Sequence, residues 1–212
     1  MMWVNKMKTC YIFAAGSFFG VDTRPKENDV VIAADGGLCA CKKENIVPDI
    51  ILGDFDSLGY IPNGENVIVV PKEKDDTDTL LAVKKGIERG ADRFKIFGGT
   101  GGRLDHTIAN LQALLYIRSR GLCGYLYDEE FVYTAIKNES ITLEGKEGNI
   151  FSVFCFGATA RGVNVKNAKY EVEDAEISAD FPLGISNAFT KKPLEISVSD
   201  GSLIICIQKN RA

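Results

Sequence analysis

The chain has 212 residues, of which 45% are hydrophobic and 25% are charged, and its formal net charge is −4. This composition excludes a wholly disordered chain, because there is enough apolar material to form a core. The 21 glycines and 6 prolines show no period, which excludes a collagen-like or low-complexity protein. The negative charge disfavours a protein that mainly binds a nucleic-acid backbone, so we expect no nucleic-acid partner.

The apolar runs of the chain are short. None approaches the roughly 18–20 residues that cross a bilayer, so no membrane association is expected. The apolar run at 11–15 is too short for a signal peptide, which favours a cytoplasmic protein. Met7 would itself make a plausible start, and we assign no function to residues 1–6.

The cysteines and the single histidine limit the chemistry that is available. In a chain of this length without a secretion signal, the six cysteines are expected to be free and mostly buried rather than paired. The pair Cys39 and Cys41 lacks the second Cys/His pair of a zinc site. Any histidine-dependent mechanism would have to use His106, but an ordinary histidine in a first helical turn is the favoured interpretation.

From residue 9 to 127, apolar strand-like runs alternate with helical patterns. Near-continuous apolar runs suit parallel strands that are covered on both faces. Helices are expected at 76–88 and 105–118, with apolar stripes at Leu80, Leu81, Val83, Lys84 and Ile87 and at Ile108, Leu111, Leu114 and Leu115. This alternation predicts an open, mostly parallel α/β sheet. The expected strands are 10–14, 30–34, 50–52, 67–70, 94–97 and 124–127.

After about residue 129 the long helical patterns stop. Short apolar or alternating stretches follow at 131–136, 140–143, 149–156, 168–172, 194–198 and 202–207. Turn residues that include Gly162 and Gly184 separate them. The pattern predicts a smaller, antiparallel β-sandwich domain. We therefore expect two domains, 1–128 and 129–212.

Four acidic or glycine-rich segments follow expected strands, at 33–37, 52–58, 72–78 and 98–105. In open α/β sheets the ligand site lies outside the carboxyl ends of the strands, so these segments are expected to meet. Each segment alone is compatible with an ordinary turn or helix start. Together they place many carboxylates at one edge, which is costly unless a cation such as Mg²⁺ is bound.

The fourth segment supplies the features of an anion site. Its glycines let main-chain N–H groups approach a phosphate, and a helix N-terminus follows. Arg103 can bind phosphate oxygens in a forked geometry, and Lys72 and Lys74 are further candidates. The segment lacks the Lys-Ser/Thr ending of a P-loop. The residues thus predict a Mg-nucleotide site for phosphoryl or pyrophosphoryl transfer.

The motifs in their order resemble the thiamine pyrophosphokinase (thiamine diphosphokinase) family. They span nearly the whole chain: 34–37, 53–57, 74–78, 98–105 with Asn110, and 186–187. The resemblance implies an α/β catalytic domain that binds nucleotide and Mg²⁺, and a β-sandwich domain for thiamine binding and dimerisation. It also implies a homodimer with thiamine sites between subunits. The implied reaction is attack of the thiamine hydroxyl on the β-phosphorus of MgATP, which gives thiamine diphosphate and AMP.

The resemblance also implies roles for individual residues. The expected metal ligands are Asp54, Asp56 and Asp78, and the expected catalytic residues are Asp56, Asp78, Arg103 and Asp105. The expected nucleotide- and phosphate-binding residues are Asp35, Gly36, Gly37, Lys74, Asp76, Thr77, Gly99, Thr100, Gly101 and Gly102. The expected thiamine-binding residues are Asp76, Ser186 and Asn187. Family members often have Glu where this chain has Ala188, so no side-chain role is assigned there. Either Asp78 or Asp105 could accept the hydroxyl proton.

Two other functions are compatible with parts of the pattern. A non-catalytic nucleotide- or thiamine-binding sensor of the same fold would differ by lacking Mg-dependent turnover. The segment 54–57 is also similar to the Asp-x-Asp loop of Mg-dependent phosphatases, which form an aspartyl phosphate. That loop normally follows the first strand, whereas two expected strands precede it here.

Overall fold

The computed structural model describes residues 7–210. The segment 1–6, to which the sequence assigned no function, lies outside the described residues, as do positions 211–212 of the expected second domain. The chain divides into two compact units, the first extending to Glu129 and the second beginning at Glu130.

The first unit contains a six-stranded sheet in the order β6-β5-β1-β2-β3-β4, in which every pair of neighbours is parallel. All residues of β1, β2 and β3 are buried, as expected for strands with both faces covered. The predicted open parallel sheet is therefore confirmed. The strands are β1 (Thr9–Phe13), β2 (Val30–Ala34), β3 (Ile50–Gly53), β4 (Val67–Val69), β5 (Arg93–Phe97) and β6 (Cys123–Tyr127).

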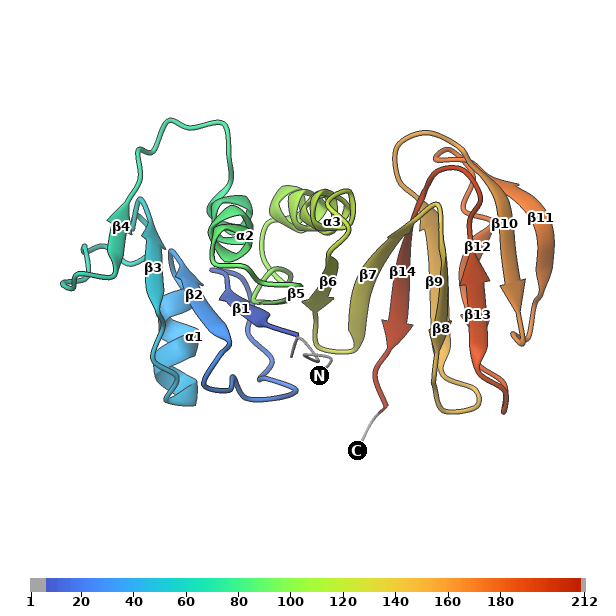
Figure 1. The fold of residues 1–212 in the computed structure, drawn as a ribbon, viewed down its shortest axis with the longest axis horizontal. Helices are drawn as coiled ribbons and strands as arrows, with labels where there is room; N and C mark the ends of the chain where they lie inside the picture. Colours follow the sequence, from blue (N-terminus) through green and yellow to red (C-terminus); the bar gives the residue numbers. More distant parts are fainter. Residues whose placement is uncertain (1–6, 211–212) are drawn as a thin grey trace, which may run out of the picture. The chain divides into compact units, whose positions relative to one another are not determined.

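Three helices pack on the two faces of this sheet (Figure 1). Helix α1 (Gly37–Glu44) packs in a cluster with Tyr11 and Phe13 of β1. Helix α2 (Asp78–Glu88) approaches Cys10, which points to the opposite face of the same strand. Helix α3 (Leu104–Arg118) lies beside α2 and covers β6. The sequence did not define α1 as a helix, because it is short and glycines occupy its N-cap and first positions, Gly36 and Gly37.

The buried faces of α2 and α3 differ from the predicted apolar stripes. Small residues form much of both buried faces, which consist of Thr79, Ala82, Val83 and Gly86 in α2 and Asn110, Ala113, Leu114 and Ile117 in α3. A Cβ at Gly86 would lie 2.6 Å from the Phe94 ring, so close packing selects a small residue. The predicted stripe residue Ile108 is 45% exposed. The stripes were right at Val83 and Leu114 and otherwise differ from the buried faces, because close approach to the sheet, rather than hydrophobicity alone, decides which residues are buried.

The strand order places a topological switch point at β1. The strands β2, β3 and β4 extend from β1 in one direction, and β5 and β6 extend in the other. Loops that leave the carboxyl ends of β1, β2 and β5 therefore diverge at this point. In open α/β sheets such a divergence leaves a crevice for a ligand.

The second unit is a sandwich of two antiparallel sheets, which confirms the predicted architecture. One sheet has the strand order β12-β9-β14-β7 and the other has the order β11-β10-β13-β8. Buried side chains from both sheets, including Phe151, Leu194 and Leu203, form one core. The strands are β7 (Phe131–Lys137), β8 (Ser140–Leu143), β9 (Ile150–Cys155), β10 (Ala160–Lys166), β11 (Val172–Ile177), β12 (Gly184–Ala188), β13 (Leu194–Ser197) and β14 (Ser202–Gln208).

Several strands of this unit differ from the sequence predictions. The predicted strand at 168–172 was wrong: Ala168 makes only an isolated bridge to Phe189, and β11 begins at the end of that range. Strands β10 and β12 were missed because each contains a residue that is typical of turns. Gly162 lies within β10 at φ +62° and Gly184 opens β12, and both strands have irregular register with a neighbour.

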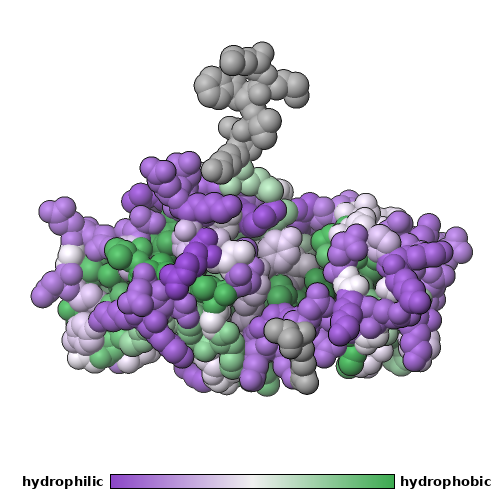
Figure 2. Space-filling view, turned by 90° about the horizontal axis from the view of Figure 1, so that it is seen from below, coloured by the Kyte–Doolittle hydropathy of each residue, from purple (hydrophilic) through white to green (hydrophobic). Residues whose placement is uncertain are grey.

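The molecular surface is mixed in character. Hydrophilic side chains predominate on the face shown in Figure 2, and hydrophobic ones form small patches between them. Within the described residues, no helix is long and apolar enough to span a bilayer. All six cysteines have free thiol groups, and those of Cys10, Cys41, Cys155 and Cys206 are buried.

Candidate functional site

A cavity of about 490 Å³ opens in the first unit, where β1, β2, β3 and β5 end. This volume lies in the range typical of small-molecule sites. It brings together segments that lie up to 96 residues apart along the chain. Its lining consists of Ala14, Ala15, Gly16, Ala34, Asp35, Asp54, Asp56, Ser57, Lys72, Lys74, Asp76, Thr77, Asp78, Thr79, Gly98, Gly99, Thr100, Gly102, Arg103, His106, Thr107 and Asn110.

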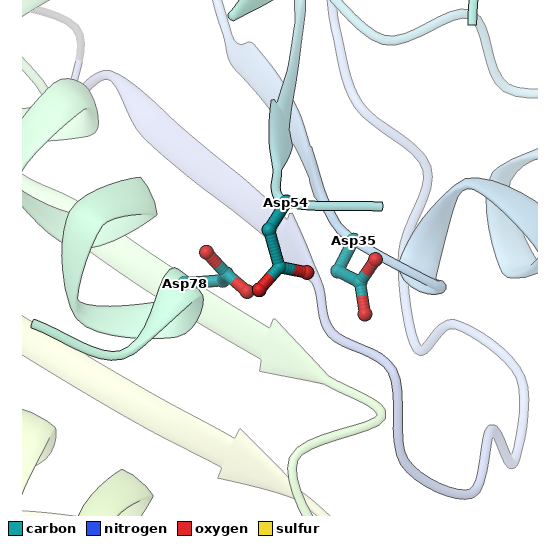
Figure 3. A group of neighbouring side chains, drawn as sticks. All are labelled: Asp35, Asp54 and Asp78. Carbon is teal, nitrogen blue, oxygen red and sulfur yellow. The ribbon is translucent and has the colours of Figure 1, made fainter. Parts of the chain in front are cut away.

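Three carboxylates converge in this cavity (Figure 3). Asp35 directly follows β2, Asp54 directly follows β3, and Asp78 is the first residue of α2. One carboxylate oxygen from each lies within 4.8 Å of the others. Because β2 and β3 are parallel neighbours, their carboxyl ends bring the first two residues together. We call Asp35, Asp54 and Asp78 the carboxylate triad.

The backbone around the triad is closely packed and strained. Asp35 has a φ of +48°, in the left-handed region that residues other than glycine rarely adopt. A Cβ at Gly53 would lie only 3.0 Å from the Asp35 Cα, so glycine permits the two strand ends to approach. Residues in sparsely populated backbone regions cluster at active sites and ligand-binding sites.

The triad has the properties of a cation site. Asp35 is 6% exposed, and its Oδ1 is buried without a hydrogen-bond partner among the described residues. Burial raises the pKa of Asp78, and the negative charges of Asp54 and Asp35 raise it further, whereas Lys74 opposes the shift. A bound cation would relieve both the repulsion and the desolvation. Three clustered carboxylate oxygens fit Mg²⁺, which prefers oxygen ligands.

The triad differs from the metal set expected from the resemblance by one residue. Asp56 lines the cavity but is exposed, and its carboxylate lies 3.3 Å from the ammonium group of Lys72. Lys72 lowers the pKa of Asp56 through this contact. Asp35, which had been expected beside the phosphates, takes the third position instead. Its location directly after a buried strand was the available signal, but its distance from Asp54 depends on strand pairing.

The glycine-rich loop 98–102 forms another wall of the cavity. Four of its five carbonyl groups are engaged by the protein. Gly98 and Thr100 accept from the main chain of Gly16 and Ser17, Gly99 accepts from Asn110 Nδ2, and Gly101 accepts from Ser17 Oγ. No main-chain N–H of residues 99–102 donates a hydrogen bond to another described residue. A run of unpaired N–H groups beside a helix N-terminus is suited to bind an anion.

The basic residues of the site are held by carboxylates. Lys74 Nζ lies 3.1 Å from Asp78, and Lys84 Nζ lies 2.5 Å from Asp76.

Thr77 caps α2 by accepting a hydrogen bond from the Leu80 N–H at 3.2 Å, so it has a structural role as well as lining the cavity.

Arg103 and Asp105 form an exposed pair at the start of α3. Two guanidinium nitrogens donate to the carboxylate, at 3.2 and 2.6 Å. The guanidinium lowers the pKa of Asp105. Arg103 and His106 line the cavity, whereas Asp105 does not.

Three expected phosphate-binding glycines also lie outside the cavity lining, namely Gly36, Gly37 and Gly101. Close packing explains why two of these positions are glycine. A Cβ at Gly37 would lie 1.9 Å from the Phe13 carbonyl oxygen, and a Cβ at Gly101 would lie 2.4 Å from Ser17. Gly36 precedes α1 at its N-cap position.

The expected thiamine residues of the second unit lie on β12. Ser186 is exposed and has a φ of +58°, at an irregularity in the pairing of β12 with β9. Its N–H donates to Ser152 Oγ at 3.0 Å. Asn187 borders a second, mostly apolar cavity of about 120 Å³.

Comparisons with known proteins agree on one family. The model described as "Thiamin pyrophosphokinase, catalytic domain" matches residues 22–123, and the model described as "Thiamin pyrophosphokinase, vitamin B1 binding domain" matches residues 138–203. The chain is 27% identical over 186 residues to thiamine pyrophosphokinase of Bacillus subtilis, covering 84% of this chain and 87% of that protein.

Solved structures of the same family have the same fold. The crystal structure of the Bacillus subtilis thiamine pyrophosphokinase matches with a TM-score of 0.84 at 24% identity, over 96% of this chain and 100% of that one. The Geobacillus thermodenitrificans thiamin pyrophosphokinase matches with a TM-score of 0.81 at 25% identity, over 96% and 99%. The Candida albicans protein matches with a TM-score of 0.79 at 13% identity, over 96% and 90%.

Proposed function

The chain belongs to the thiamin pyrophosphokinase family, and we propose that it transfers a pyrophosphoryl group from MgATP to the hydroxyl group of thiamine. The products are thiamine diphosphate and AMP. The observation that carries this proposal is the cavity of the first unit, in which the carboxylate triad and the unpaired amide groups of the loop 98–102 line the same space. The two features suit a divalent cation and a polyphosphate respectively.

In the proposed site, different walls of the cavity bind the phosphate groups and the metal ion. The N–H groups of the glycine-rich loop bind and orient phosphate oxygens, and Asp35, Asp54 and Asp78 hold Mg²⁺. Once bound, Mg²⁺ supplies neutralisation of the phosphate charge. Arg103 is 74% exposed in its side chain and paired with Asp105, so it is free to exchange a carboxylate partner for phosphate oxygens. Catalysis rests mainly on orientation and charge neutralisation, as is general for phosphoryl transfer.

The attacking hydroxyl group must lose its proton during the transfer. Asp78 and Asp105 were the two candidate acceptors from the sequence. Asp105 is the weaker base, because Arg103 lowers its pKa. Asp78 lines the cavity, whereas Asp105 does not. We therefore favour Asp78 as the group that accepts the proton late in the reaction.

We further propose that the second unit binds thiamine and mediates dimerisation. The support is the match of residues 138–203 to the vitamin B1 binding domain model. Within this unit Ser186 and Asn187 are the proposed thiamine-binding residues. Asp76 of the first unit is proposed to contact thiamine too. The proposed enzyme acts in the cytoplasm as a homodimer.

Product analysis tests the proposed reaction. Purified protein is incubated with MgATP and thiamine, and AMP, ADP and the thiamine phosphates are separated. We expect equal amounts of AMP and thiamine diphosphate, and no product when EDTA removes the metal. Formation of ADP and thiamine monophosphate would overturn attack on the β-phosphorus. Binding of both ligands without turnover would instead establish the sensor function.

A further inference from the structure

We infer that Ser17 is a positioning residue, whose hydroxyl group fixes the glycine-rich loop so that its N–H groups remain available to the polyphosphate of the substrate. The inference rests on the proposed function, which assigns the loop 98–102 to phosphate binding. Ser17 lies on the segment that follows β1, outside all of the motifs that indicated the family, and it does not line the cavity itself.

Ser17 makes two hydrogen bonds to the loop. Its main-chain N–H donates to the Thr100 carbonyl at 2.8 Å, and its Oγ donates to the Gly101 carbonyl at 2.8 Å. The side-chain bond joins residues 84 positions apart. Ser17 therefore engages two consecutive carbonyl groups at the tip of the loop, and only one of these bonds depends on its side chain.

The contact between Ser17 and Gly101 also leaves no room for a side chain at position 101. Gly101 has a φ of +73°, and a Cβ there would lie 2.4 Å from both Ser17 Cβ and Oγ. The conformation and the absence of a side chain at Gly101 are thus matched to the serine. The resemblance implies that Gly101 binds phosphate, and the structure adds a contact of its carbonyl group on the protein side of the loop.

Other groups restrain the earlier part of the loop. The Gly16 N–H donates to the Gly98 carbonyl at 2.7 Å, and the buried Asn110 donates to the Gly99 carbonyl at 2.7 Å. Thr100 Oγ1 donates to Asp128 at 3.0 Å. Ser17 is the side chain that engages the main chain of Gly101, and no other described residue donates to that carbonyl.

These hydrogen bonds separate four carbonyl groups of the loop, which the protein engages, from the N–H groups of residues 99–102, which remain unpaired among the described residues. A carbonyl oxygen that turns toward the cavity would repel phosphate oxygens, so retaining the carbonyl groups on the protein side strengthens anion binding. Without its Ser17 partner, the Gly101 carbonyl is free to reorient, and rotation of that peptide also moves the adjacent N–H of Gly102. Because Gly102 lines the cavity, we expect loss of the Ser17 hydrogen bond to weaken binding of the polyphosphate.

The test compares Ser17→Ala with Ser119→Ala in the full chain. Ser119 Oγ donates to the Tyr116 carbonyl at 2.8 Å at the end of α3, so the control removes the same type of bond away from the cavity lining. We expect Ser17→Ala to raise the KM for MgATP and the Kd for inorganic tripolyphosphate by about fivefold to tenfold. The kcat and the KM for thiamine are expected to stay within about twofold of the wild type.

The possible results separate the inference from its alternatives. A merely structural role would lower the folded fraction, so kcat would fall while the KM for MgATP and the tripolyphosphate Kd stayed unchanged, and this would overturn the inference. Unchanged values in Ser17→Ala would overturn it as well. Absence of thiamine-dependent turnover in the wild type would remove the proposed function, while tripolyphosphate binding by the wild type and Ser17→Ala would still decide the role of Ser17.

Discussion

The side-chain amide of Asn187 is bound to the main chain of Tyr170. Its Oδ1 accepts from the Tyr170 N–H at 3.0 Å, and its Nδ2 donates to the Tyr170 carbonyl at 2.6 Å. The same Oδ1 also accepts from the Ala188 N–H at 2.8 Å. Three of the four hydrogen bonds that an asparagine amide can make are therefore used within the second unit. We therefore expect Asn187 to contribute to the proposed thiamine site by holding the chain beside it.

Replacement of Asn187 tests this positioning role. Asn187→Ala should raise the KM for thiamine by about tenfold or more, because it releases Tyr170 and the adjoining β12 segment. The KM for MgATP should change by less than about twofold. The measurement is steady-state kinetics with each substrate varied in turn.

Asn167→Ala provides a matched control for that variant. Asn167 Nδ2 donates to the Pro193 carbonyl at 2.9 Å, so the change also removes an asparagine amide that binds the main chain of this unit. We expect a normal thiamine KM in the control. Equal effects of the two changes on thiamine KM would show that Asn187 serves only general stability.

The raised pKa of Asp78 predicts a pH-dependent stability in the absence of metal. Since the folded-state pKa lies above the unfolded one, the folded protein binds more protons between the two values, and the free energy of unfolding falls as pH rises through this window. Asp78→Asn removes this penalty. Urea denaturation in EDTA should show the variant gaining stability relative to the wild type as pH increases from about 4 to 7.

Glu88→Gln is the control at the other end of α2. Glu88 is exposed and forms a salt bridge with Lys85 at 2.7 Å. Its stability difference from the wild type should show no comparable gain with increasing pH. A difference between Asp78→Asn and the wild type that stays constant from pH 4 to 7 would contradict a raised pKa for Asp78.

Magnesium should stabilise the protein through the carboxylate triad. Binding to the folded state at about one hundred times Kd contributes about 2.7 kcal/mol, which corresponds to an increase in Tm of roughly 5–10 °C. Asp54→Asn should abolish most of this increase, while raising the Tm in EDTA because one repelling charge is removed. Thermal unfolding with and without MgCl₂ measures both effects.

Asp56→Asn distinguishes the triad from the ligand set that the family resemblance implied. The carboxylate of Asp56 lies outside the triad and pairs with Lys72. We expect this variant to retain most of the magnesium-dependent increase in Tm and to lose most of its activity. Loss of the thermal effect would instead place Asp56 among the magnesium ligands.

The cysteines should react at very different rates with a thiol reagent. Burial raises the pKa of Cys41 and of Cys206 to about 12, so little reactive thiolate forms at pH 8. Burial raises the pKa of Cys10 as well, whereas Cys39 is exposed. Mass spectrometry after brief iodoacetamide treatment should find Cys39 modified and these three unmodified. Rapid modification of Cys41, two residues away in α1, would contradict the described packing.

Much of the proposed site could be predicted from local sequence. Asp35 and Asp54 each follow a continuous apolar strand, and Thr77 with Asp78 has the pattern of a helix start. These are short-range features, because strand and helix ends are set by neighbouring residues. The alternation of strands and helices also indicated the α/β class, and the change of pattern near residue 129 indicated a second unit. Sequence by itself therefore determined which segments form the proposed site.

Tertiary structure decided which members of those segments meet. Asp54 and Asp56 are two positions apart, yet only Asp54 lies with Asp35 and Asp78, because strand pairing and backbone direction set its distance from residues far along the chain. The same is true of Ser17 and Gly101, whose hydrogen bond depends on the pairing of β1 with β5. Contacts at such separations follow from sheet order, register and close packing, which local patterns do not specify.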